Sequence, residues 1–148
     1  MNLHQYLETI KSNTAKFNIV TRQGLALSEI DVLERKLCIR LPDDLVSFYH
    51  FSNGLEGDDW VFNIIPLNEV EIQTDYEGEY LTFAEYMIFS ETCGLCIDKG
   101  DKNLYKLFTH KQELGKEKTQ KRRYFANSVK DFIQLYCDQG TFGVFNQE

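Results

Sequence analysis

The sequence predicts an α+β fold, with helices gathered at the N-terminus, a central, mostly antiparallel or mixed β-sheet, and a helix at the C-terminus. Two observations carry this prediction. Segments up to Gly54 repeat apolar residues at the period of a helix, whereas residues 60–108 hold short apolar runs separated by turn residues. Strands that follow one another without intervening helices are typical of α+β folds. The length of 148 residues suits one domain, and we expect residues 1–148 to form it.

Two helices are predicted near the N-terminus. The first carries one apolar stripe, formed by Leu3, Tyr6, Leu7 and Ile10. The second begins at Ser28, whose hydroxyl can accept a hydrogen bond from a backbone amide, and Asp31 three residues later completes an acidic variant of the capping box. Its apolar stripe is Ile30, Leu33 and Leu37.

A third helix is predicted to start in the turn that contains Pro42, because proline lacks the N–H that would be unpaired there. Asp43 and Asp44 follow, where the helix dipole favours negative charge. The buried face is expected to contain Leu45, Phe48 and Tyr49, and Asn53-Gly54 supplies the positive-φ residue that ends the helix.

The second half of the chain is expected to contain short strands and a final helix. Strands are predicted at residues 60–65, 86–89, 95–97 and 104–108. Residues 68–85 are ambiguous and indicate a loop with some helix, and the basic residues 111–123 indicate an exposed loop or hairpin connection. Ser128 is expected to cap the last helix, whose apolar stripe precedes an end at Gly140 and consists of Val129, Phe132, Ile133, Tyr136 and Cys137.

Charge is distributed unevenly along the chain. Residues 41–98 hold thirteen Asp and Glu and no Lys or Arg, whereas residues 99–123 carry a net charge of about +6. If these carboxylates share one face, they attract a basic partner and repel nucleic acid and anionic lipid. The alternative is a solvated surface that only keeps the protein soluble.

Composition favours a cytoplasmic protein. No apolar run approaches the roughly 18 residues that cross a bilayer, and the N-terminal residues lack the basic and apolar pattern of a signal peptide. Four Cys without an export signal indicate a reducing compartment with free thiols.

Three short motifs stand out in the sequence. The longest is SEIDVLERKLCIRLPDDLVSFYHFSNGL at residues 28–55, with a Leu-Glu pair, Leu-Pro, an aromatic-bearing helix and Asn-Gly in order. The others are IPLNEV at residues 65–70 and ANSVKDFI at residues 126–133. Together they resemble the SUKH superfamily, which includes the yeast cell-wall-assembly (glucan synthesis) regulator family, although Val129 replaces the more usual Phe.

The resemblance implies a non-enzymatic α+β domain that binds other proteins. Bacterial relatives are commonly immunity proteins that bind and block toxins, including nucleases, whereas eukaryotic relatives are adaptors in cell-wall regulation. From this resemblance together with the acidic segment we expect an immunity protein for a cognate, basic toxin, which could be a nuclease, and the alternative is a regulatory adaptor. We expect no cofactor, no nucleic acid and no membrane among its partners.

Other chemistries are weakly indicated. Cys93-Gly94-Leu95-Cys96 has the spacing of a redox motif, but no helix follows it. A structural zinc site needs four ligands and the sequence offers one such Cys pair, so we expect no metal. The three His lie in no hydrolase motif, and we expect no catalytic residue. Lys121-Arg122-Arg123 could contact nucleic acid, although the acidic segment argues against it.

The predicted interaction surface combines acids with aromatic anchors, because Trp and Tyr often dominate binding energy at interfaces. For Trp60 the sequence slightly favours the alternative, a core position at the start of a strand. The predicted partner-binding residues are Glu56, Asp58, Asp59, Trp60, Glu69, Glu71, Asp75, Tyr76, Glu77, Glu79 and Tyr80.

Overall fold

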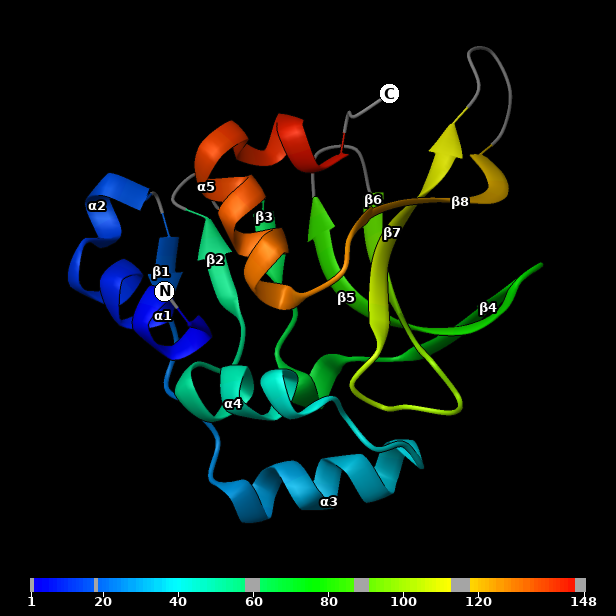
Figure 1. Ribbon diagram of the computed structural model, residues 1–148, viewed down its shortest axis with the longest axis horizontal. Coiled ribbons are helices and arrows are strands. Elements are labelled where there is room, and N and C mark those ends of the chain that lie inside the picture. Colours follow the sequence, from blue (N-terminus) through cyan, green and yellow to red (C-terminus); the bar gives the residue numbers. More distant parts are fainter. Residues whose placement is uncertain (1, 18, 58–61, 87–90, 113–117, 146–148) are drawn as a thin grey trace.

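A computed structural model describes residues 2–17, 19–57, 62–86, 91–112 and 118–145, and it has the predicted α+β architecture (Figure 1). The described helices are α1 (Leu3–Ser12), α2 (Thr14–Phe17), α3 (Leu27–Leu37), α4 (Asp43–Phe51), the 3-10 helix η1 (Leu67–Glu69) and α5 (Val129–Phe145). The described strands are β1 (Ile19–Thr21), β2 (Leu55–Gly57), β3 (Phe62–Ile64), β4 (Ile72–Asp75), β5 (Gly78–Tyr86), β6 (Glu91–Ile97), β7 (Tyr105–Gln112) and β8 (Lys118–Ala126).

The described strands form one antiparallel sheet in the order β1-β2-β3-β5-β6-β7-β8. β5 is long enough to pair with two strands on the same edge. Its first half pairs with β4 in the register Asp75↔Gly78 to Ile72↔Leu81, and its second half pairs with β3 in the register Ile64↔Ala84 to Phe62↔Tyr86. β4 and the first half of β5 therefore form a hairpin that extends from the centre of the sheet.

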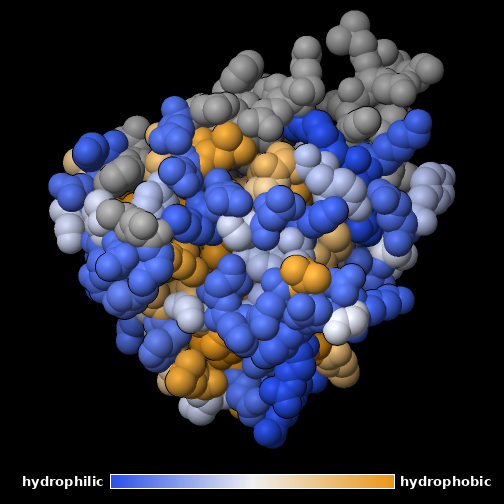
Figure 2. Space-filling model, viewed as in Figure 1, coloured by the Kyte–Doolittle hydropathy of each residue, from blue (hydrophilic) through white to orange (hydrophobic). Residues whose placement is uncertain are grey.

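The core lies between one face of the sheet and the helices. Phe83 of β5 is at its centre, since its ring lies 6.4 Å from the Phe48 ring of α4 and 5.7 Å from the Phe132 ring of α5. The predicted helical stripes supply buried residues to this core, namely Leu7, Ile10, Ile30, Leu45, Phe48, Tyr49, Val129, Phe132, Ile133 and Tyr136. On the face shown in Figure 2, hydrophilic side chains predominate and hydrophobic ones form small separate patches.

The turn between α4 and β2 is the predicted Asn-Gly turn. Gly54 has φ of +93°, a conformation that favours glycine. The Asn53 side chain accepts a hydrogen bond from the Leu67 N–H at 2.8 Å, and the Tyr49 hydroxyl donates to Ile65 O at 2.9 Å. This turn therefore fixes β2 and η1 beside α4.

Four local predictions are wrong. α3 starts one residue before Ser28, because the Glu29 carboxylate accepts a hydrogen bond from the Ala26 N–H and so holds the first turn. Residues 68–85 form most of a hairpin, since strand pairing supplies order that local periodicity does not contain. An exposed loop or hairpin connection was expected over residues 111–123, but residues 118–126 form β8, and α5 continues past the expected end at Gly140 to Phe145.

The strands predicted at residues 95–97 and 104–108 are confirmed as parts of β6 and β7. The predicted strand at 60–65 is confirmed at Phe62–Ile64, and its residues 60 and 61 lie outside the described residues. Of the strand predicted at 86–89, Tyr86 ends β5 and the remainder is not among the described residues.

Phe108 is fully buried although it points away from the helices. Its ring lies across Gly94 of the neighbouring strand, where the register pairs the two residues. A Cβ added at Gly94 would lie under 3.0 Å from ring atoms of Phe108. Glycine is therefore required at this position for packing.

We predict that Gly94→Ala destabilises the protein by about 1–3 kcal/mol, because the methyl group would displace a ring that is enclosed on its other side. The measurement is the free energy of unfolding from urea denaturation. Gly100→Ala is the matched control, since the nearest atom to its Cβ is a side-chain oxygen of Asp98 at 3.3 Å, and it should change stability by less than about 0.5 kcal/mol. Equal effects of the two substitutions would contradict the packing argument.

Candidate functional site

The sheet face opposite the helices carries a row of polar side chains. Glu56, Asn63, Glu85 and Thr92 are register neighbours on four adjacent strands, β2, β3, β5 and β6. Arg22 Nη2 donates to Glu56 Oε1 at 3.0 Å and to Asn63 Oδ1 at 2.6 Å, and Asn63 Nδ2 donates to Glu85 Oε1 at 3.1 Å. These contacts hold the side chains of the row in defined positions.

Next to this row the surface is hollowed by about 440 Å³. Glu69, Glu71 and Glu85 supply carboxylates to it, and Tyr80 supplies an aromatic wall. The other lining residues are Asn63, Ile65, Pro66, Gln73, Thr82 and Thr92. No Lys or Arg of the described residues lines it, so the hollow has a negative potential. We call Glu56, Glu69, Glu71 and Glu85 the acidic surface.

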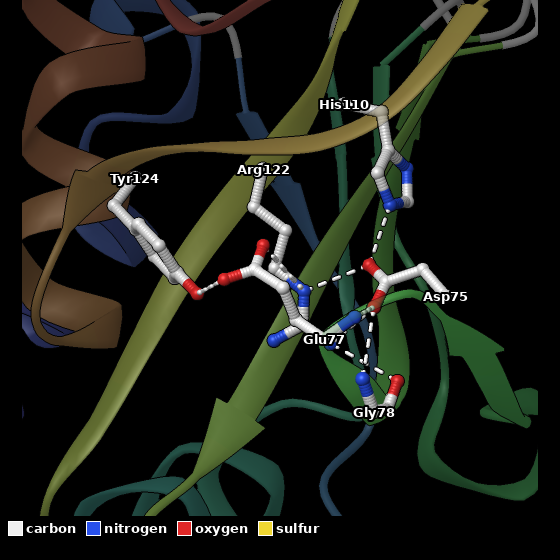
Figure 3. A network of polar contacts seen from close by, with 6 residues as sticks. All are labelled: Asp75, Glu77, Gly78, His110, Arg122 and Tyr124. Carbon is white, nitrogen blue, oxygen red and sulfur yellow. Dashed lines mark hydrogen bonds and ion pairs between the residues drawn. The ribbon is translucent and has the colours of Figure 1, made fainter.

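Beside the acidic surface, a buried ion pair joins the β4–β5 hairpin to β8 (Figure 3). The Asp75 carboxylate accepts hydrogen bonds from Arg122 Nε at 2.7 Å, Arg122 Nη2 at 2.8 Å and His110 Nε2 at 2.8 Å. It also accepts from the backbone N–H groups of Glu77 at 2.9 Å and Gly78 at 3.2 Å. The side chains of Asp75 and Arg122 are 1% and 4% exposed, so water does not screen the pair.

Arg122 is enclosed by aromatic rings as well as by its carboxylate partner. Its guanidinium carbon lies 4.3 Å from the Phe108 ring centroid and 5.5 Å from that of Tyr80. Arg122 Nη2 also donates to Gly78 O at 3.1 Å, and the Tyr124 hydroxyl donates to Glu77 at 3.3 Å. The rings and the hydrogen bonds together replace the hydration that the guanidinium loses on burial.

Ionisation in this network follows from these contacts. Burial alone would raise the pKa of Asp75, but the hydrogen bonds from Arg122, His110 and the Glu77 N–H outweigh burial and hold that pKa well below its usual range. The hydrogen bond to Asp75 raises the pKa of Arg122. Both groups are therefore charged at neutral pH.

The predicted site residues divide into four groups. Glu56, Glu69, Glu71 and Tyr80 lie at or beside the hollow. Tyr76 (89% exposed), Glu77 and Glu79 lie at the tip of the β4–β5 hairpin, and Asp58, Asp59 and Trp60 lie outside the described residues. The placement of Asp75 on an exposed surface is wrong, because Asp75 is buried in the ion pair with Arg122.

Sequence reasoning missed Glu85, Asn63, Arg122 and His110. Asn63 and Glu85 are brought together only by the β3–β5 register. Arg122 belongs to a basic run, which normally indicates solvated charge. One sequence signal could have revealed Arg122 and His110, namely the alternation by which residues two apart in a strand share a face. His110 pairs with Arg122, and Phe108 pairs with Tyr124, on one face of β7 and β8.

The cysteine spacing does not make a redox pair. Cys93 and Cys96 lie on β6, where residues three apart point to opposite faces and their Cα atoms are about 10 Å apart, beyond disulfide reach. Burial raises the pKa of the Cys93 thiol, and the four cysteines are free. Within the described ranges, no three His, Cys, Asp or Glu side chains are grouped to hold a metal ion.

Comparison with known proteins identifies the family. The model of the SMI1 / KNR4 family (SUKH-1) matches residues 24–135, which include the acidic surface and the Asp75–Arg122 pair. The chain belongs to this family. The match runs from just before α3 into α5, so the family resemblance read from the sequence is confirmed.

No curated protein and no solved structure matches the chain. In the part of the chain that the structure describes, every helix is too short or too polar to span a bilayer.

We predict that Asp75→Asn destabilises the protein by about 3 kcal/mol or more, because it leaves the buried Arg122 cation uncompensated while the amide oxygen can still accept the turn hydrogen bonds. Urea denaturation measures the effect. Glu77→Gln is the control, since Glu77 is 48% exposed and lies 3.6 Å from Arg122 Nε, and it should cost less than about 1 kcal/mol.

The double variant Asp75→Asn/Arg122→Met should be less destabilised than Asp75→Asn alone, because it removes the unpaired charge as well. The prediction is contradicted if the loss of stability in the double variant equals the sum of the losses in Asp75→Asn and Arg122→Met. That result would mean that the two residues act independently.

We predict that part of the stability is lost in acid because of Asp75. Its pKa is lower in the folded than in the unfolded chain, where it is about 3.9. The unfolded state therefore binds the proton first as the pH falls, and the stabilisation is fully present above that pKa and declines below it. The measurement is the urea denaturation midpoint of the wild type and of Asp75→Asn from pH 7 to pH 3. The wild type should be the more stable of the two at pH 7, and this difference in stability should shrink below about pH 4. A difference in stability that stays constant over this range would contradict the prediction.

Proposed function

We propose that this protein is a non-enzymatic binding domain, formed by residues 1–148, that neutralises a cognate bacterial toxin with a basic surface. The observation that carries the proposal is the acidic surface, where the carboxylates of Glu69, Glu71 and Glu85 line a hollow that no Lys or Arg of the described residues lines. Membership of the SMI1 / KNR4 family (SUKH-1) supports a protein partner.

Electrostatics explain how such a surface would act. Glu69 and Glu71 are exposed and carry no strong cationic partner among the described residues, so their field reaches solvent. A negative patch accelerates encounter with a positive partner by roughly 10- to 1000-fold at low salt. The fixed row of Glu56, Asn63 and Glu85 would then give the docked partner defined hydrogen-bonding groups.

The geometry of the hollow suggests how a toxin would be blocked. Nucleases bind polyanions through Lys and Arg, and an acidic surface that covers these side chains competes directly with the substrate. The toxin need not be altered chemically, so no catalytic residue is required in the immunity protein. Tyr76, exposed at the tip of the β4–β5 hairpin, would supply an aromatic contact to the toxin.

We predict that Glu69→Lys/Glu71→Lys weakens binding to the toxin encoded beside this gene by about 100-fold or more, mainly through slower association, because two attractive charges become repulsive. The measurement is surface plasmon resonance at several salt concentrations. Glu8→Lys/Asp31→Lys is the matched control, since it makes the same charge change on α1 and α3.

The electrostatic proposal is refuted if both variants lose affinity equally. It is also refuted if the association rate of the wild type does not depend on salt.

The identity of the neighbouring gene decides between the two branches of the family. A locus without a toxin gene, together with binding to a regulatory protein, would favour an adaptor.

A further inference from the structure

Two side chains that line the hollow of the acidic surface already contact a guanidinium of this chain. Asn63 is one of them, since Arg22 Nη2 donates to its Oδ1 at 2.6 Å and also to Glu56 Oε1 at 3.0 Å. Tyr80 is the other, since the guanidinium carbon of Arg122 lies 5.5 Å from the centroid of its ring. The walls of the hollow therefore contain groups that accommodate arginine within the protein itself.

These two arginines do not neutralise the hollow. Arg22 is paired with Glu56, and Arg122 is paired with Asp75, so each ion pair is neutral as a whole. Two of the lining carboxylates accept hydrogen bonds from side-chain amides, which are neutral donors and leave the negative charge in place. Three lining carboxylates therefore have no cationic partner among the described residues, namely those of Glu69, Glu71 and Glu85. A hollow with this charge attracts a cation.

The arrangement of the carboxylates favours a guanidinium over an ammonium. They converge on the hollow from three segments, which are η1, the residue before β4, and β5. A guanidinium has five N–H donors in one plane and can bond to two carboxylates at once, whereas an ammonium is a compact, strongly hydrated point charge. A guanidinium also packs well against an aromatic ring, which Tyr80 supplies.

The size and the apolar part of the lining suit one arginine side chain. The hollow of about 440 Å³ lies within the roughly 300–1,000 Å³ of sites that hold a small ligand. Ile65 and Pro66 line it beside the carboxylates. They offer an apolar contact to the methylene groups of an arginine, which are commonly buried while the charged end is bonded elsewhere.

We propose that this hollow binds one arginine side chain of the partner and discriminates against lysine. The inference rests on the proposed function, since the arginine belongs to the basic surface of the toxin. The guanidinium bonds to carboxylates of the lining, and the methylene groups lie against Ile65 and Pro66. An arginine held in this way cannot at the same time bind an anionic substrate of the toxin.

The test is an NMR titration of the isotope-labelled full chain with three blocked amino acids. N-acetylarginine amide and N-acetyllysine amide each carry one positive charge, whereas N-acetylcitrulline amide has the shape of arginine without its charge. We expect the arginine compound to bind saturably and to shift the signals of the Asn63 side-chain amide and the Glu85 backbone amide. It should bind about fivefold more tightly than the lysine compound, and the citrulline compound should bind less tightly than either.

A pair of variants tests the lining carboxylates. Glu71→Gln/Glu85→Gln should weaken binding of the arginine compound about fivefold, because ion pairs near the surface contribute modestly. The glutamine oxygens can still accept the hydrogen bonds from Gln73 and Asn63, so the fold is retained. Glu8→Gln/Asp31→Asn is the matched control, since it removes the same charge on α1 and α3, and it should leave the affinity unchanged.

The inference is overturned if the arginine compound does not bind saturably, if the lysine or the citrulline compound binds as tightly, or if the control variant loses as much affinity. The proposed function is tested separately. If arginine is not preferred while Glu69→Lys/Glu71→Lys still loses affinity for the toxin, the inference is wrong and the proposed function stands. If arginine is preferred while that variant binds the toxin as the wild type does, the proposed function is wrong and the arginine comes from another partner.

Discussion

The ion pair between Asp75 and Arg122 is the contact on which the shape of the sheet depends. β4 and β8 are separated in the sheet order by β5, β6 and β7, so in a flat sheet they would lie roughly 19 Å apart. Their side chains nevertheless meet at 2.7 Å. The sheet must therefore curl strongly, and the ring of Phe108, resting on Gly94, fills the inside of the curve.

This curvature shapes the surface on both sides of the β4–β5 hairpin. Beyond Leu81, where its pairing with β6 stops, β5 lies apart from β6, and a hollow of about 1310 Å³ lies between the β4–β5 and β6–β7 hairpins. On the other side, Glu71 and Gln73 line the acidic hollow of about 440 Å³. Tyr80 lines both hollows.

Formal charge overstates how acidic the surface is. Of the thirteen acids between residues 41 and 98, Asp43 is paired with Lys102, Glu56 is paired with Arg22, and Asp75 is buried against Arg122. Asp44 is partly buried and accepts a hydrogen bond from Tyr105, and burial raises its pKa. The charges that remain free to act on a partner are therefore fewer and more localised than the sequence indicates.

The helices and the core residues that they supply could be predicted because the signal, the spacing of apolar residues, lies within each helical segment. Leu7, Ile10, Phe48 and Tyr49 are buried as their helical spacing indicates. β4 and β5 could not, because their alternation is weak and their order comes from β3, β6 and β8, which lie elsewhere in the sequence. Asp75 looked like one more surface acid because its partner Arg122 lies in a basic run 47 residues later.

That separation has a consequence for the order in which the molecule assembles. During synthesis the β4–β5 hairpin leaves the ribosome well before β8, so Asp75 is first an exposed acid in a short, weakly stable ribbon. The hairpin cannot take its final position against the sheet until Arg122, 47 residues later in the chain, has been synthesised. A chain that ends before Arg122 lacks the contact that joins β4 to β8, so the β4–β5 hairpin takes its final position beside the acidic hollow only after β8 has been synthesised.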